Sequence, residues 1–288
     1  MPSTLDIRRR IRSVKSTRQI TKAMEMVSAA KMRRAQAAAL ASRTYANLAW
    51  ELLRNVSPKD GESIHKIMRK PDGTGKTAVV LMTSNRGLIG GFNAHLAETE
   101  VKLEGSIEYL TLGKKGRDAI RARGGSIAAD FPKLDAASGV AEIMPLAKLV
   151  IDDFVAGKYD AVKLVYMHYV STLRQETRVM QLLPLAELSP TPSLIKEGEK
   201  GGVPDYLFEP TPDQVLEILL PRLVTMQIYQ ALLETNASEH SARMVAMKNA
   251  SDAASDLVSE LTLDFNQIRQ AAITKEISEI VSGSLAIK

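Results

Sequence analysis

The last part of the chain constrains the fold most strongly. Between Pro212 and Gly283 it contains a single helix breaker, Pro221, and both glycine and proline destabilise a helix interior. Apolar or small residues recur there in alternating steps of three and four, which is the heptad pattern of a coiled coil. The stripe comprises Leu219, Leu223, Met226, Gln230, Leu233, Ala237, His240, Met244, Met247, Ser251, Ala254, Val258, Leu261, Phe265, Ile268 and Ala272. This pattern predicts one very long coiled-coil helix, with Pro221 shifting its start or kinking it.

The first part of the chain carries a similar signal. Residues 4–56 include neither glycine nor proline, and Ser57-Pro58 ends the pattern. Apolar residues follow a helical spacing at Ile7, Ile11, Val14, Ile20, Met24 and Val27. Each stripe needs a partner that covers it, and the chain has to return after the middle segment, so we expect the two helices to pair antiparallel. His240 interrupts the second stripe and is expected to be packed between helices.

The segment from about Lys76 to Pro210 has a different period. Short apolar runs predict strands at 77–83, 107–112, 126–131, 160–170 and 178–185, and helical spacing predicts helices at 114–123 and 140–156. Strands that alternate with helices favour a partly parallel sheet, while residues 189–205 are expected to form a loop. We therefore expect a coiled-coil helix over 1–57, an inserted α/β domain over 76–210 and a second coiled-coil helix over 211–288.

Composition excludes several classes of protein. The chain has no cysteine, which rules out disulfides, thiolate catalysis and zinc sites built on Cys. No apolar run approaches the roughly 20 residues that span a bilayer, and the N-terminus lacks the apolar region of a signal peptide. The net charge is +5, and up to Arg43 eleven Lys and Arg side chains accompany only two acids, Asp6 and Glu25. This local excess of positive charge implies an acidic partner or surface.

Two glycine-rich stretches invite a nucleotide-binding interpretation. Gly73–Thr77 departs from the phosphate-loop pattern, because Lys70 stands where that pattern has glycine and the strand follows the motif instead of preceding it. Ser84–Asn93 follows the first predicted strand, where a helix N-terminus can bind phosphate, but it lacks the dinucleotide pattern and is more typical of a structural turn. The four histidines are scattered, so we expect neither a metal site nor a cofactor.

Four stretches of the chain resemble the gamma subunit of F-type ATP synthases. Ile20–Met32 is similar to the family's N-terminal helix, Ser84–Asn93 to its strand-end motif, Ser238–Asp252 to its C-terminal helix and Asn266–Gly283 to its terminal signature. Many members have Asp at the position of Asn85 and Cys at that of Ile89, and the redox-cysteine insert of chloroplast members is missing. The match follows the whole chain in order.

The resemblance implies an antiparallel two-helix coiled coil with an inserted Rossmann-like α/β domain. It implies a rotating central-stalk shaft without a catalytic site of its own, which couples proton flow to ATP synthesis and regulates ATPase activity and proton flow. The implied partners are the alpha and beta subunits of the catalytic ring, the epsilon subunit and the c-ring, with the delta subunit in the same complex. The implied location is the cytoplasmic face of a bacterial inner membrane, as a peripheral subunit held there by its partners.

The resemblance also implies roles for individual residues. Those matched to contacts with the catalytic ring are Arg8, Arg9, Met24, Arg269, Gln270, Thr274 and Glu279. Those matched to the foot, which faces the rotor ring and the epsilon subunit, are Arg43, Tyr45, Tyr206 and Glu209. An added charge at Met24 is expected to disturb coupling.

The sequence leaves open two alternative functions from other classes of protein. The basic N-terminal helix could belong to a coiled-coil adaptor that binds nucleic acid, although its bases alternate with an apolar stripe and aromatic residues are absent before Tyr45. The middle segment could instead be a small nucleotide-binding enzyme. Salt-sensitive binding to duplex DNA tests the first alternative, and nucleotide titration tests the second.

Overall fold

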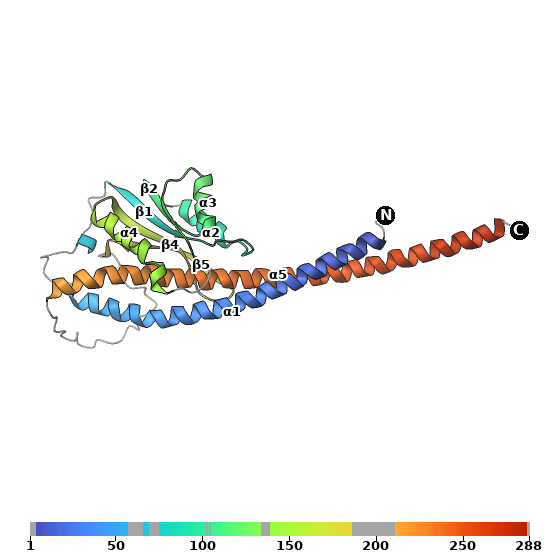
Figure 1. Ribbon diagram of the computed structural model, residues 1–288, viewed down its shortest axis with the longest axis horizontal. Helices are drawn as coiled ribbons and strands as arrows, with labels where there is room; N and C mark the ends of the chain where they lie inside the picture. Colours follow the sequence, from blue (N-terminus) through green and yellow to red (C-terminus); the bar gives the residue numbers. More distant parts are fainter. Residues whose placement is uncertain are drawn as a thin grey trace. The chain divides into compact units, whose positions relative to one another are not determined.

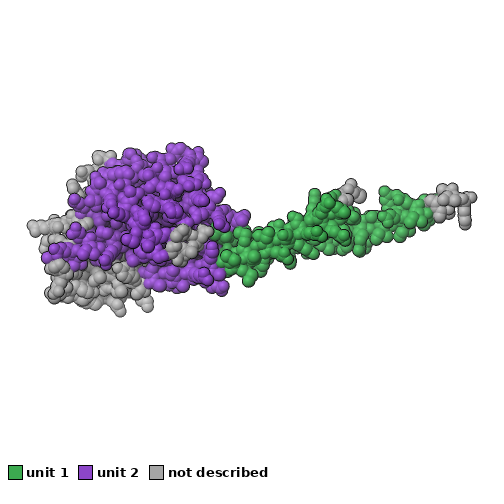
Figure 2. Space-filling view, viewed as in Figure 1, with its two compact units in different colours: residues 1–29, 243–288 green, residues 30–242 purple. Residues whose placement is uncertain are grey.

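The computed structural model describes residues 4–56, 66–68, 75–101, 103, 105–133, 139–185 and 211–286. The chain forms two compact units, unit 1 with residues 1–29 and 243–288, and unit 2 with residues 30–242 (Figure 2). Two long helices, α1 (Thr4–Val56) and α5 (Pro212–Ala286), contribute to both units. The predicted helices are therefore confirmed, and Pro221 lies inside α5 without ending it. α5 also continues past Gly283 to Ala286.

Unit 1 is a pair of helices that run in opposite directions. The guanidinium of Arg8 lies over the ring of Phe265, 5.8 Å from its centroid. Arg18 donates a hydrogen bond of 3.2 Å to the hydroxyl of Ser255. Ten residues forward along α1 thus correspond to ten residues back along α5. The predicted antiparallel pairing is confirmed in this unit.

The face that α1 turns toward its partner differs from the predicted one. Ile20 and Val27 were expected in the buried stripe, yet 58% and 56% of their surfaces are exposed. Thr21 and Ser28 are buried instead, in line with Ile7 at steps of seven residues. Their hydroxyls donate to carbonyls of the same helix, Thr21 to Arg18 at 3.0 Å and Ser28 to Met24 at 2.7 Å. Because these bonds satisfy the buried hydroxyls, small polar residues can occupy a stripe that the sequence suggested was aliphatic.

Unit 2 contains a five-stranded sheet. The strands are β1 (Lys76–Met82), β2 (Ile107–Leu112), β3 (Ile127–Phe131), β4 (Tyr159–Tyr169) and β5 (Gln175–Leu183). Their order is β3-β2-β1-β4-β5, and all neighbours are parallel except β5, which pairs antiparallel with β4. The five predicted strands and the partly parallel sheet are confirmed.

Helices cover both faces of this sheet (Figure 1). Val79 and Leu81 of β1 pack in a core with α2 (Phe92–Val101) and α3 (Lys114–Ala122). Val80, on the opposite face of β1, belongs to a core with α4 (Met144–Val155) and with residues 216–232 of α5. The predicted helix at 140–156 divides into a short 3-10 helix, η2 (Val140–Glu142), and α4. A second 3-10 helix, η1 (Lys66–Met68), contributes Ile67 to the α4 core.

An ion pair joins β1 and β2 at their amino ends. Lys76 Nζ lies 2.6 Å from Glu108 Oε1, and the hydroxyl of Tyr159 donates to Glu108 Oε2 at 3.0 Å. The hydrogen bond from Lys76 holds the pKa of Glu108 below its usual value, against the opposing effect of burial.

This lowered pKa predicts a contribution of Glu108 to acid sensitivity. A carboxyl whose pKa falls on folding stabilises the native state above its unfolded pKa, and this stabilisation is lost as the pH falls through the native pKa. We expect wild-type protein to lose stability below about pH 4.5 and Glu108→Gln to show a shallower loss there. Urea denaturation between about pH 3 and pH 7 measures the free energy of unfolding at each pH. If this free energy falls with pH equally steeply in both proteins, the prediction is contradicted.

Candidate functional site

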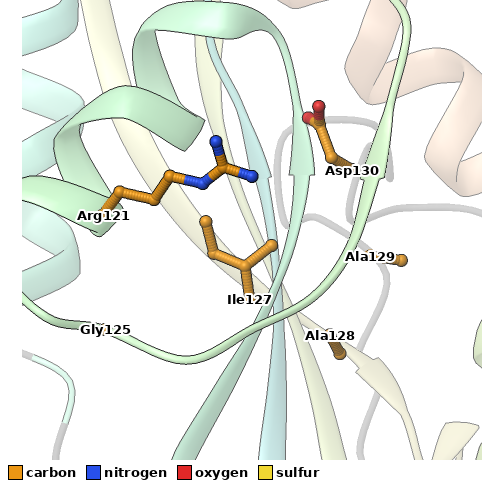
Figure 3. A pocket seen from close by; sticks show the side chains of 6 residues that line it. All are labelled: Arg121, Gly125, Ile127, Ala128, Ala129 and Asp130. Atoms are coloured by element: carbon orange, nitrogen blue, oxygen red, sulfur yellow. The ribbon is translucent and has the colours of Figure 1, made fainter.

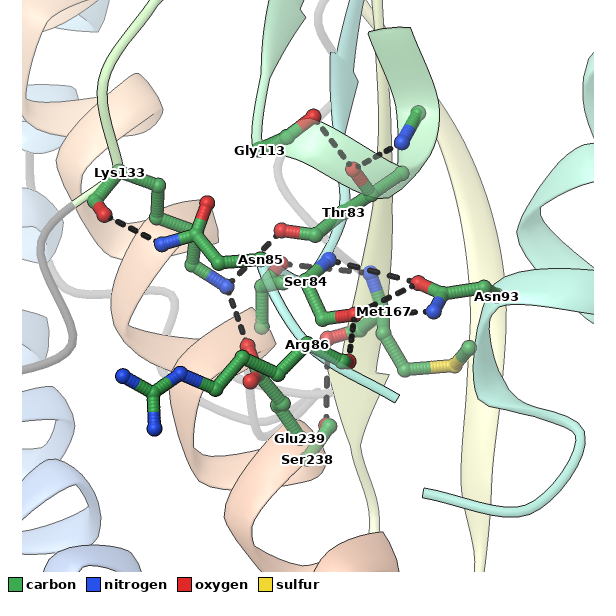
Figure 4. Close-up of polar contacts among 12 residues, drawn as sticks. Thr83, Ser84, Asn85, Arg86, Asn93, Gly113, Lys133, Met167, Ser238 and Glu239 are labelled. Carbon is green, nitrogen blue, oxygen red and sulfur yellow. Dashed lines mark hydrogen bonds and ion pairs between the residues drawn. The ribbon is translucent and has the colours of Figure 1, made fainter. Parts of the chain in front are cut away.

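The carboxyl edge of the sheet is where a doubly wound fold would bind a nucleotide. The strand order reverses at β1, which has β2 on one side and β4 on the other, and ligands of such folds bind outside the strand ends at this point. The glycine-rich stretch Ser84–Asn93 begins there, directly after β1. Figure 4 shows the polar side chains that gather at this edge.

These polar groups bond to one another. Lys133 Nζ lies 2.6 Å from Glu239 Oε2 and donates to the carbonyl of Thr83 at 3.1 Å (Figure 4). The side-chain amide of Asn85 donates to the carbonyl of Lys133 at 2.6 Å. The hydroxyl of Ser84 donates to the carbonyl of Arg86 at 2.8 Å. The edge is therefore filled by the chain's own side chains.

The glycines near this edge allow close packing between elements. Gly113 has a φ of 113°, and a Cβ atom there would lie 2.4 Å from the carbonyl oxygen of Thr83. The amide of Gly116 donates to the hydroxyl of Thr83 at 2.8 Å. Glycine at both positions brings the start of α3 against the end of β1. These two glycines explain how α3 packs on β1; they lie outside Ser84–Asn93.

The other glycine motif also has a structural partner. The amide of Gly75 donates to the carboxylate of Asp160, and Lys76 is the first residue of β1. Gly73 lies outside the described residues. The described part of Gly73–Thr77 thus forms the entry to a strand, as its structural interpretation predicts.

Two surface grooves lie on unit 2. The first lies beside β3 and is lined by Arg121, Gly125 and residues 127–130 (Figure 3). Its carboxylate, Asp130, already accepts a bond from Arg117 at 3.1 Å and another from Thr111 at 2.8 Å. The second groove lies between α2 and β5.

The described residues form neither a metal cluster nor a bilayer-spanning helix. Within the described ranges, no three His, Cys, Asp or Glu side chains come together as a metal site would require. Among the helices described, none is long and apolar enough to cross a bilayer.

The helix pair of unit 1 exposes apolar side chains on both helices. On α1 these include Ile20, Met26 and Val27. On α5 they follow a helical spacing at Ile273, Ile277 and Ile280, of which Ile280 is 72% exposed. Residues 269–282 of α5 are all exposed, because Arg8 is level with Phe265 and α1 begins at Thr4. Exposed apolar stripes of this kind mark surfaces that bind another protein.

The two helices of unit 1 also differ in charge. In unit 1, the exposed bases of α1 are Arg8, Arg9, Arg10, Arg12, Lys15, Arg18 and Lys22. Four exposed acids of α5 recur every four residues, at Asp252, Asp256, Glu260 and Asp264. This spacing places the four carboxylates along one side of α5, over about 18 Å at the rise of an α-helix. The surface of the pair is therefore basic along α1 and carries a row of acids along α5.

The residues matched to the catalytic ring all lie in unit 1, spread along the helix pair. Arg8, Arg9, Arg269, Gln270, Thr274 and Glu279 are exposed, and Met24 is half-buried. Thr274 donates to the carbonyl of Gln270 at 3.0 Å, and Glu279 lies 3.6 Å from Lys275. Their roles toward a partner stay predictions.

The residues matched to the foot are described less completely. Arg43 and Tyr45 lie in α1, in the part where only the backbone is described. Tyr206 and Glu209 lie outside the described residues.

One feature of the structure was not predicted from the sequence. His240 was expected to be packed and is buried, but it belongs to a continuous stretch of α5, residues 231–241, that is buried on every side. Within this stretch, the polar heptad position His240 was the one local signal in the sequence.

Comparisons with known proteins complete this description. Residues 3–287 match the family model described as ATP synthase. The chain is 45% identical to the ATP synthase gamma chain of Pelotomaculum thermopropionicum, over 100% of both chains. It is 42% identical to that of Chloroflexus aurantiacus, over 100% of this chain and 99% of the relative. The fold resembles a chain of the Euglena gracilis mitochondrial ATP synthase, with a TM-score of 0.66, 19% identity, and coverage of 99% of this chain and 94% of the other.

Proposed function

The chain belongs to the family of ATP synthase gamma chains, and from this premise we propose that it is the rotating shaft that couples proton flow to ATP synthesis. The observation that carries the proposal is the helix pair of unit 1, whose exposed apolar residues and unequal charges make its sides differ. A shaft with unlike sides contacts each catalytic site of a surrounding ring differently. Differential contact of this kind is what shifts the conformations of a partner. The shaft contributes no catalytic group of its own.

The proposed partners are those that the resemblance to gamma subunits implies. The alpha and beta subunits contact the helix pair through Arg8, Arg9, Met24, Arg269, Gln270, Thr274 and Glu279. The c-ring and the epsilon subunit contact the foot, around Arg43, Tyr45, Tyr206 and Glu209, and the delta subunit belongs to the same complex. Held by these partners, the chain is a peripheral subunit on the cytoplasmic face of the inner membrane. The segments 1–57, 76–210 and 211–288 are its proposed functional divisions.

The charges of the helix pair favour a protein partner over nucleic acid. Nucleic-acid binding requires a basic surface facing the phosphates. The bases of α1 share unit 1 with the acidic row Asp252, Asp256, Glu260 and Asp264 on α5, which would repel phosphates. The exposed isoleucines of α5 also fit an apolar protein surface better than a phosphate backbone.

The proposal is tested in membranes that carry the other synthase subunits but lack this chain. We expect such membranes to synthesise no ATP from a proton gradient, and added chain to restore synthesis and to purify with the catalytic ring. Coupled synthesis at the normal rate without the chain would refute the proposal.

Met24→Lys is expected to impair coupling more than assembly. Met24 is half-buried in α1, three residues before the exposed Val27 on the same side of the helix, so a lysine there adds a charge to the surface that faces the ring. We expect the variant to assemble and to hydrolyse ATP while pumping fewer protons per ATP, by about fivefold, which is the lower range for coupled sites. Parallel measurement of hydrolysis and proton uptake in vesicles checks this, with Met24→Leu as the uncharged control. Equal proton uptake per ATP in both variants would count against this role of Met24.

A further inference from the structure

Part of α5 is buried on all sides although it is polar. Residues 231–241 are all buried, whereas a helix enclosed by protein is normally apolar all round. Its polar side chains are Glu234, Thr235, Asn236, Ser238, Glu239, His240 and Ser241. We call residues 234–241 the buried polar segment. All of it lies in unit 2.

The end of β4 holds this segment through backbone hydrogen bonds. Thr235 and Ser238, one helical turn apart, bond to the amide and the carbonyl of Met167, at 3.4 and 3.3 Å (Figure 4 shows the Ser238 bond). Ser241, a further turn along, donates to the carbonyl of Thr172 at 2.6 Å. Three consecutive turns of α5 therefore bond to β4 and to the β4–β5 connection.

A buried ion pair fixes the same segment to the loop after β3. The side chains of Lys133 and Glu239 are only 2% and 6% exposed, and Nζ and Oε2 are 2.6 Å apart. Lys133 also donates to the carbonyl of Thr83 at the end of β1. Glu239 is thus tied, through one cation, to two loops of the sheet.

A third set of bonds reaches α1. Glu234 pairs with His168 of β4 at 2.6 Å and accepts from Gln230 at 3.1 Å. Gln230 in turn accepts a bond from Ser42 of α1. On the same side, Gln36 of α1 donates to the hydroxyl of Tyr169 at 2.5 Å.

The polar contacts differ in kind from the rest of the contact between α5 and the sheet. Residues 216–232 of α5 pack through apolar side chains, and apolar contact is non-directional. Hydrogen bonds and ion pairs, in contrast, require fixed distances and angles. They are lost when a helix turns about its axis or slides by one residue.

We propose that the buried polar segment locks α5 against rotation relative to the sheet, with Lys133 and Glu239 as its main positioning residues. The inference rests on the proposed function, because a lock of this kind matters in a subunit that carries torque. Force applied to the α/β domain then passes into α5 through directional bonds. Without these bonds the apolar contacts alone resist turning.

The test uses whole ATP synthase in sealed vesicles, carrying Lys133→Met/Glu239→Leu. Both members of the ion pair are replaced, because removing one partner of a buried pair is strongly destabilising. ATP hydrolysis is measured with an uncoupler, where the load is low, and the limiting proton-concentration ratio is measured without it, where the load is high. We expect unchanged hydrolysis at low load and a limiting ratio that is lower by about fivefold or more. A loss that appears only under load is not expected of a residue that merely supports folding.

The matched control is Lys76→Met/Glu108→Leu. This pair has the same Nζ–O distance of 2.6 Å but joins the amino ends of β1 and β2. We expect the control to reach the wild-type ratio. If both double variants reach that ratio, the lock carries no load and the inference is overturned. If wild-type enzyme itself pumps no protons, the proposed function fails instead.

Ser238→Ala keeps the inference testable if the double variant does not assemble. It removes one hydroxyl and its bond to Met167 while both charges stay. We expect a smaller fall in the limiting ratio, with unchanged hydrolysis. An unchanged ratio in this variant, beside a double variant that fails to assemble, would also overturn the lock.

Discussion

Lys133→Met alone is expected to lower the free energy of unfolding of unit 2 by about 3–5 kcal/mol, the range for breaking a buried ion pair from one side. The substitution removes the ammonium group of Lys133 from the buried carboxylate of Glu239, and it frees the carbonyl of Thr83 from its bond to Lys133. Burying an unpaired charge costs far more than losing the bond itself. Urea denaturation of the purified chain, followed by circular dichroism, measures this loss.

The double variant Lys133→Met/Glu239→Leu separates two effects of this pair. Because both charges are gone, we expect it to regain most of the lost stability. The pair would then matter little for stability and much for transmitting load. If the free energy of unfolding of Lys133→Met lies within about 1 kcal/mol of the wild-type value, the pair contributes no more than an exposed ion pair does. The carboxylate of Glu239 would then be solvated in another way.

Gly113→Ala is expected to destabilise unit 2 by about 3 kcal/mol, the upper range for a residue forced into a glycine-only conformation. Gly113 has φ 113° and ψ 135°, and the new Cβ would lie 2.4 Å from the carbonyl oxygen of Thr83. Neither that carbonyl nor the start of α3 can move freely, because Thr83 also bonds to Gly116 and to Lys133. Thermal unfolding of the purified chain measures the loss.

Gly124→Ala is the matched control for this prediction. Gly124 also has a positive φ, of 75°, but nothing lies within 4 Å of its added Cβ. We expect it to cost only about 1 kcal/mol, from backbone strain alone. Equal losses at the two positions would show that the close approach to Thr83 contributes nothing.

The long helices were predictable because their signal is local. A span without glycine or proline, with apolar residues at helical spacing, is enough to predict α1, which covers Thr4–Val56. Which residues of α1 face α5 was less predictable. The size of Ile20 and Val27 suggested a buried position, whereas the close pairing is made by Thr21 and Ser28, whose hydroxyls bond to their own helix.

The contacts of the buried polar segment could not be predicted from the sequence. Lys133 and Glu239 are 106 positions apart, and neither lies in a sequence motif that predicts an ion pair. The burial of α5 from Ala231 to Ser241 depends on the sheet, on α1 and on the β4–β5 connection together. Polar heptad positions such as His240 gave the only local indication.

The candidate partner surface was predictable only through resemblance. Composition and charge indicated an acidic partner for the N-terminal helix, while the matched motifs supplied Arg269, Gln270 and Thr274. The structure adds that these residues share unit 1 with exposed apolar side chains. No local pattern distinguishes a residue that contacts a ring from one that faces water.

The rotation of this chain within a catalytic ring is the central claim, and it can be observed directly. The chain has no cysteine, so Lys115→Cys on the exposed surface of α3 gives a single attachment point for a bead. With the catalytic ring fixed to a glass surface, we predict that ATP drives the bead in one direction around a fixed axis. A bead that only fluctuates about one angle while the same complexes hydrolyse ATP would contradict the claim.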